Sequence, residues 1–201
     1  LYKEILEIDN NHFQSIFLLG LLSAQTKNFD KSKKLLNQVI SMKPNHTDAL
    51  YNLANVYKHL GEFNEAENYY NKAIQIEPNN AKVHNNLGNV QQEWKQFNRA
   101  IESYRRAVAL KPNYGEAYSN LGAALQGNGD FSGAAEAHRC ALRVSGDQPK
   151  LHFNYGVFCQ DQGGIEAAMQ AYKSAIGLNH DFADAHKNLG MLLLLKGDFL
   201  N

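Results

Sequence analysis

Five asparagines recur at intervals of 34 residues, at Asn52, Asn86, Asn120, Asn154 and Asn188. A side-chain amide offers two N–H donors and one acceptor oxygen. A row of amides at a regular spacing can therefore hydrogen-bond the backbone of an extended peptide, whatever side chains that peptide carries. The alternative interpretation is that these asparagines only support the packing of the helices that carry them. The sequence leaves both interpretations open.

Other polar residues recur three and six positions after the asparagines, and a lysine precedes one of them by four positions. Together these positions form the predicted peptide-binding surface. Its members are Asn52, Asn55, Lys58, Lys82, Asn86, Asn89, Gln92, Asn120, Gln126, Asn154 and Asn188.

The eight histidines raise the question of a metal site. His84, His152 and His186 share one phase of the 34-residue period, so they should lie on different helices, at least roughly 8–10 Å apart. Zinc holds its nitrogen ligands at about 2 Å, so these histidines cannot share one ion. His138 stands where other segments have tyrosine, which indicates a core histidine. We expect no metal and no cofactor.

No catalytic motif accompanies these residues. The chain has no nucleophile elbow, phosphate-binding loop or H-E-x-x-H sequence. Acidic pairs such as Glu65 and Glu67 fall on an exposed helical face without a predicted pocket. We therefore expect this stretch of chain not to be an enzyme.

The elements that carry the asparagines follow from the same 34-residue period, which is clearest in residues 47–80. Apolar residues there recur every three or four positions, which is the rhythm of an amphipathic helix. Gly61 can adopt the left-handed conformation that ends a first helix, and Pro78 ends the second. Each period therefore predicts two helices joined by a short turn, which pack against those of the neighbouring periods.

The leucine–glycine pair, the alanines and the closing proline of this period resemble the tetratricopeptide repeat. The resemblance implies an all-α, right-handed superhelical solenoid of antiparallel helix pairs, with the first helix of each pair on the concave side. It covers the whole chain as one array. The expected repeats are a half repeat at 1–12, full repeats at 13–46, 47–80, 81–114, 115–148 and 149–182, and a partial repeat at 183–201.

Within this family the asparagine row is similar to the groove of O-linked N-acetylglucosamine transferase. That similarity implies a scaffold that binds a partner protein or an extended peptide on its concave surface. Chaperone-binding repeats instead hold a terminal carboxylate with converging cations. Here Lys82, Lys150 and Lys187 alternate with acidic residues, which disfavours such a clamp.

The two ends of the chain are more apolar than the middle. The closing segment NLGMLLLLKGDF looks like the last repeat before the catalytic domain in bacterial fusions of these repeats to glycosyl- or sulfotransferases. We read the chain as part of a longer protein, so it could be the substrate-recruiting region of such a transferase. A self-assembling scaffold is the other alternative. The expected contacts to a second copy or a following domain are Tyr2, Ile5, Leu192, Leu194 and Leu195.

Composition restricts the partner further. The 201 residues include 20 basic and 20 acidic side chains, so the zero net charge argues against a nucleic-acid partner or an anionic membrane surface. The longest apolar run, residues 191–195, is far shorter than the roughly 20 residues of a membrane span. Two cysteines are too few for a disulfide framework. We expect a cytoplasmic protein, or a nucleocytoplasmic one if the source is eukaryotic.

Overall fold

The computed structural model describes residue 9 and residues 11–197, and every regular element in that part of the chain is an α-helix. The chain divides into two compact units, Leu1–Leu110 and Lys111–Asn201. The first unit contains α2 (Phe13–Gln25), α3 (Phe29–Met42), α4 (Thr47–His59), α5 (Phe63–Ile76), α6 (Ala81–Glu93) and α7 (Phe97–Leu110). The second contains α8 (Gly115–Gly127), α9 (Phe131–Ser145), α10 (Pro149–Asp161), α11 (Ile165–Leu178) and α12 (Ala183–Lys196). The predicted all-α architecture of paired helices is confirmed.

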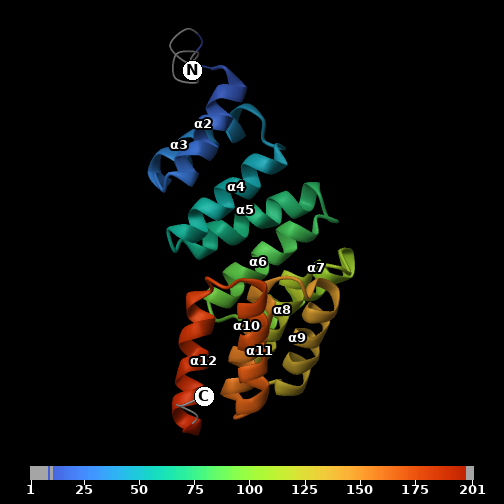
Figure 1. Cartoon of the computed structure of the whole chain (residues 1–201). Coiled ribbons are helices and arrows are strands. Elements are labelled where there is room, and N and C mark those ends of the chain that lie inside the picture. The colour runs from blue at the N-terminus through green and yellow to red at the C-terminus, as the bar shows by residue number, and fades with distance from the viewer. Residues whose placement is uncertain (1–8, 10, 198–201) are drawn as a thin grey trace. The chain divides into compact units, whose positions relative to one another are not determined.

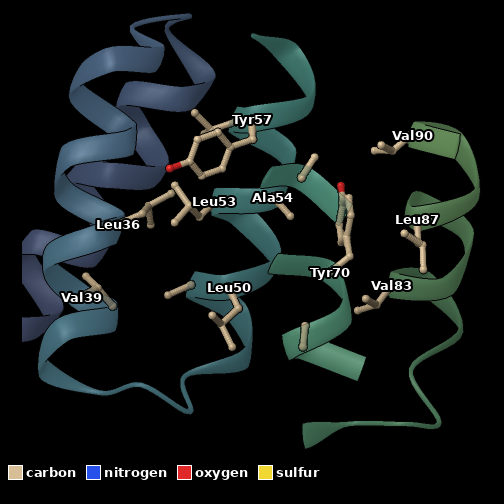
Figure 2. Close-up of a cluster of buried hydrophobic side chains, with 14 of the residues drawn as sticks. Leu36, Val39, Leu50, Leu53, Ala54, Tyr57, Tyr70, Val83, Leu87 and Val90 are labelled. Atoms are coloured by element: carbon tan, nitrogen blue, oxygen red, sulfur yellow. The ribbon is translucent and has the colours of Figure 1, made fainter. Parts of the chain in front are cut away.

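In the first unit, each helix packs against the next one along the chain, as Figure 1 shows from α2 to α7. The core lies between these layers. Leu50 and Leu53 of α4 are buried against α3, whereas Tyr70 of α5 lies between α4 and α6 (Figure 2). The apolar positions three or four residues apart supply this core, because they place their side chains on the buried faces of each helix.

The second unit repeats this packing. Helices α8 and α9 form one pair and α10 and α11 the next, and α12 packs against α11. The first helices of successive pairs also contact one another, α2 with α4 and α4 with α6 in the first unit, and α8 with α10 in the second. We call the exposed side of these adjoining first helices the first-helix surface of each unit.

Small residues let the two helices of a pair approach closely. A Cβ atom added to Gly88 of α6 would lie 2.6 Å from the ring of Tyr104 in α7, and one added to Gly156 of α10 would lie 2.6 Å from Tyr172 in α11. Such distances are too short for a carbon contact. The glycine at this phase therefore provides the space that the tyrosine ring occupies.

The turn within each pair uses one left-handed residue. Gly61, Gly129 and Gly163 have φ values of 74°, 84° and 76°. Lys27 and Lys95 occupy the same phase of the period with φ values of 58° and 60°. The turn therefore requires a positive φ at this position, and Lys27 and Lys95 adopt the left-handed conformation that favours glycine.

The apolar C-terminal helix differs in part from the sequence prediction. Leu192, expected as a contact residue, is only 1% exposed and belongs to the core against α11. Leu194 and Leu195, by contrast, are 52% and 78% exposed. Tyr2 and Ile5 lie outside the described residues. No helix in the described part of the chain is long and apolar enough to cross a lipid bilayer.

Candidate peptide-binding surface

All the predicted peptide-binding residues lie on first helices. In the first unit, α4 carries Asn52, Asn55 and Lys58, and α6 carries Lys82, Asn86, Asn89 and Gln92. In the second unit, α8 carries Asn120 and Gln126, α10 carries Asn154, and α12 carries Asn188. The asparagines and glutamines among them are half-buried, and Lys82 is exposed.

The amide of Asn86 is engaged within the protein. Its Nδ2 donates to the hydroxyl oxygen of Tyr51 at 2.7 Å and to Oδ1 of Asn55 at 3.3 Å. Its Oδ1 accepts from Nδ2 of Asn85 at 3.3 Å. Both donors of this amide therefore support the contact between α4 and α6. Asn52 has a different environment, because the one bond of its Nδ2 within residues 11–110 goes to the carbonyl of Asp48 in its own helix, at 2.7 Å.

Buried tyrosines from the second helices supply further partners for these amides. The hydroxyl of Tyr70 donates to Oδ1 of Asn55 at 2.5 Å, and that of Tyr104 donates to Oδ1 of Asn89 at 2.7 Å. In the second unit, the Tyr172 hydroxyl donates to Oε1 of Gln160 at 2.7 Å. Burial raises the pKa of Tyr70 and Tyr172, so both hydroxyls stay protonated and act as donors at neutral pH.

Polar pairs separated by 35 residues join adjacent first helices in both units. The Tyr51–Asn86 bond recurs as a 3.0 Å bond from Nδ2 of Asn154 to Oγ of Ser119. Further along the same helices, Lys58 and Glu93 form an ion pair at 3.6 Å, and Gln126 donates to Asp161 at 2.9 Å. The row of asparagines therefore takes part in helix packing, as the alternative interpretation of the sequence allowed.

The cations on this surface are dispersed. Lys58 is paired with Glu93, and Nζ of Lys82 lies 4.8 Å from the centre of the Tyr51 ring. A carboxylate clamp needs several cations that converge on one point. The described residues of α4 and α6 do not provide that arrangement.

Two open hollows adjoin each other on the first-helix surface of the second unit. The larger, of about 360 Å³, is lined by Pro149, Lys150, Phe153, Asn154, Asn179, Phe182 and Asp184. The smaller, of about 250 Å³, is lined by Ser119, Asn120, Ala123, Gln126, His138, Phe153, Asn154, Val157 and Phe158. Phe153 and Asn154 line both, and the Phe153 ring lies 5.1 Å from that of Phe182. On this surface, the amide of Asn154 is therefore flanked by two partly apolar depressions.

The histidines of the shared phase have a structural role that the sequence did not suggest. Nε2 of His84 lies 2.9 Å from the carbonyl of Pro78, and Nε2 of His152 lies 2.8 Å from that of Gly146. His186 makes the same contact with His180 at 2.8 Å. Each histidine therefore holds the loop that precedes its own helix. In the described residues, no three histidine, cysteine or acidic side chains are grouped to hold a metal ion.

The hollows themselves were missed at the level of the sequence. Their signal is the substitution of two residues at once in one helix pair, Ala123 for the asparagine of earlier repeats and His138 for the tyrosine. Each change replaces a larger side chain by a smaller one, and because the two positions are neighbours in the fold the changes together leave a hollow. Phe153 shares its phase with Phe17 and Tyr51, so the aromatic residue at that phase was the available signal for the other hollow.

These helix pairs, their 34-residue spacing and their shared first-helix surface define the tetratricopeptide repeat class of protein. Family models described as tetratricopeptide repeat match residues 13–46, 47–80 and 69–102, and one described as TPR repeat matches 95–129 and 159–197. These matches span more than half of the chain. The chain belongs to the tetratricopeptide repeat family.

Solved structures share this fold. The structure of pilF from Pseudomonas aeruginosa is 25% identical with a TM-score of 0.77, over 92% of this chain and 85% of that one. MamA is 22% identical with a TM-score of 0.69, over 82% of this chain and 96% of that one. YrrB, described as a TPR protein with an unusual peptide-binding site, is 20% identical with a TM-score of 0.66, over 93% of this chain and 96% of that one. No curated protein sequence matches the chain.

Proposed function

We propose that the chain is a non-catalytic interaction scaffold whose first-helix surface binds an extended peptide segment of a partner protein. The observation that carries this proposal is Asn154, which lines both hollows of the second unit. Its Nδ2 makes one bond, to Ser119, and its Oδ1 has no hydrogen-bond partner within residues 111–197. A peptide backbone can bond such an amide while its side chains enter the depressions on either side.

The geometry of an extended peptide fits this arrangement. Alternate side chains of an extended chain point the same way and are separated by about 7 Å. A single amide flanked by two hollows therefore suits one backbone unit with a side chain on each side. The solved structure of YrrB supports the proposal to the extent that its description gives that protein a peptide-binding site.

The amides of the predicted surface contribute to different degrees under this proposal. Asn52 and Asn154 have side-chain donors or acceptors left to bond a peptide, whereas both N–H donors of the Asn86 amide are used in bonds to Tyr51 and Asn55. We therefore assign backbone contacts to Asn52 and Asn154, and a packing role to Asn86.

Selection from a library of random peptides displayed on phage tests the proposal on the intact chain. We expect enriched peptides whose affinity falls at least tenfold in the Asn154→Ala variant. The matched control is Asn71→Ala, the same change at an exposed position of the second helix α5, which should leave affinity unchanged. Enriched peptides that bind Asn154→Ala as well as the original chain would contradict the proposal, as would the absence of any enrichment.

A second candidate function is a contact made through α12, favoured by the exposure of Leu194 and Leu195. The partner would be a second copy of the chain or another domain of a longer protein, such as the transferase of the sequence resemblance. Sedimentation equilibrium at increasing concentration tests self-association. A mass that rises with concentration and returns to the monomer in Leu195→Glu supports it, and a constant monomeric mass rules out the second copy.

A further inference from the structure

The position of His138 is occupied by tyrosine in three other helix pairs. Tyr70, Tyr104 and Tyr172 each pass beneath the first helices, and their hydroxyls donate to amides on the first-helix surface. In those three repeats, the tyrosine hydroxyl therefore occupies the space beneath the amide of the first helix. The His138 side chain has a five-membered ring and no hydroxyl, so it is shorter than tyrosine and ends before it reaches that space.

The first-helix partner has changed in the same repeat. Ala123 stands where Asn55 and Asn89 stand in the first unit, and it has no polar atom for a bond. In the first unit Tyr104 also donates to Oε1 of Gln92, whereas Gln126, at the same phase in the second unit, donates to Asp161. As a result, neither ring nitrogen of His138 has a hydrogen-bond partner among the described residues, although the residue is only 3% exposed.

The smaller hollow lies over this histidine. Ala123 of α8 and Phe153, Val157 and Phe158 of α10 give it apolar walls, with the His138 ring 5.2 Å from that of Phe158. None of its described lining residues carries a charge. Its volume of about 250 Å³ falls below the roughly 300–1,000 Å³ of pockets that enclose a whole small-molecule ligand. One side chain of a larger ligand is the better match.

We propose that this hollow, which we call the His138 hollow, binds a tyrosine side chain of the partner peptide. The inference rests on the proposed function and specifies its ligand. The partner's ring would pack on Phe153 and Val157. Both imidazole nitrogens are covered in the chain alone, so a rotation of the His138 ring would bring one of them to the partner's hydroxyl. The partner thereby supplies the hydroxyl that Tyr70, Tyr104 and Tyr172 supply in the other repeats.

The chemistry of the hollow selects against other side chains. A neutral imidazole has one donor and one acceptor nitrogen, which suits a hydroxyl that can do both. Lysine, arginine or a carboxylate would place a charge where none of the described lining residues carries the opposite charge, which is unfavourable. Phenylalanine would fill the space and leave the imidazole without a partner.

Small model compounds test the hollow independently of any peptide. The intact chain, with isotope-labelled histidine rings, is titrated with N-acetyltyrosine amide and followed by NMR. We expect saturable shifts of the His138 ring signals with this compound, at least threefold weaker binding of N-acetylphenylalanine amide, and no shift with N-acetyllysine amide. Unmoved His138 signals, or equal responses to all three compounds, would overturn the inference.

His138→Tyr provides the decisive variant. Tyrosine is accommodated at this position in three other helix pairs and faces a glycine here too, Gly122, so the variant should fold. It should fill the hollow and abolish binding of N-acetyltyrosine amide. His180→Tyr, the same change at an exposed position, is the matched control and should retain binding.

The library selection separates failure of this inference from failure of the proposed function. Peptides that depend on Asn154, but have no fixed tyrosine and bind His138→Tyr equally well, leave the scaffold function standing and refute the hollow's specificity. Histidine shifts with the tyrosine compound, without any enriched peptide, support the hollow and refute the peptide scaffold.

Discussion

Asn52 and Asn86 occupy equivalent positions in neighbouring repeats, yet their side chains have different partners. Asn86 joins α4 to α6 through bonds to Tyr51 and Asn55, whereas Asn52 bonds its own helix in the described part of the first unit. The same residue type at the same phase is therefore a packing element in one repeat and an available amide in the next. This difference decides what an alanine at each position should do.

Asn86→Ala should lower the free energy of unfolding by about 1–3 kcal/mol, because it removes the two bonds that join α4 to α6, to Tyr51 and Asn55, and the bond from Asn85. Asn52→Ala should change it by no more than about 0.5 kcal/mol, since its bond is exposed and local. Urea denaturation of both variants measures the difference. Equal stability of the two variants would show that the Asn86 bonds contribute nothing to the packing of α4 and α6.

The burial of His138 has a consequence for acid stability. Burial lowers the pKa of His138 from 6.5 to about 4 in the folded chain. Between those values the unfolded chain binds more protons than the folded one, so stability falls as the pH falls. This contribution is fully present above pH 6.5 and is lost as the pH approaches about 4.

The histidine should therefore remove about 3 kcal/mol of stability between pH 6.5 and pH 4, at about 1.4 kcal/mol for each pKa unit. Unfolding by urea at several pH values, compared between the original chain and His138→Tyr, isolates this residue from the other titrating groups. The variant should show a shallower loss on acidification. Parallel pH profiles would mean that His138 is not buried in the neutral form.

At the scale of the elements, the turn within each helix pair requires one left-handed residue whatever the sequence offers. Gly61 meets that requirement without steric cost, and nothing lies within 4 Å of a Cβ added there. Lys95 meets it with a side chain, at a cost of about 1–2 kcal/mol in backbone conformation. The turn imposes this backbone conformation. The backbone N–H groups of Lys95 and Gln96 bond the carbonyls three and five residues earlier, as those of Gly61 and Glu62 do in their own turn.

Lys95→Gly should raise the free energy of unfolding by about 0.5–1 kcal/mol, which is the relieved strain less the added freedom of glycine in the unfolded chain. Gly61→Ala is the opposite change at an uncrowded position and should lower stability by about 1 kcal/mol. Thermal denaturation of the two variants checks both signs. A loss of stability in Lys95→Gly would show that the lysine side chain contributes more than its backbone costs.

The period made the helix pairs predictable from sequence, because apolar spacing, turn glycines and closing prolines all indicate the same elements. The candidate site was less predictable from the sequence. The asparagine row placed the surface on the first helices, but the partners of Asn86 and the hollow over His138 depend on side chains from helices 12 to 35 residues away. Leu192 was misplaced for the same reason, since an apolar run does not reveal which of its residues faces α11.

At the scale of the molecule, each unit presents a first-helix surface, and the two surfaces differ. In the first unit the amides of α4 and α6 are largely engaged with tyrosines and with each other. In the second unit the smaller residues Ala123 and His138 open a depression beside Asn154. The second unit is therefore where the scaffold proposal predicts the most specific contact.

The most direct test of that proposal is the map of backbone amide shifts in the ¹⁵N-labelled chain when a library-selected peptide is added. We predict that the largest shifts fall on α8 and α10, around Asn120 and Asn154, and that they saturate with one peptide per chain. Shifts confined to the second helices α9 and α11, or spread evenly over the chain, would contradict peptide binding on the first-helix surface.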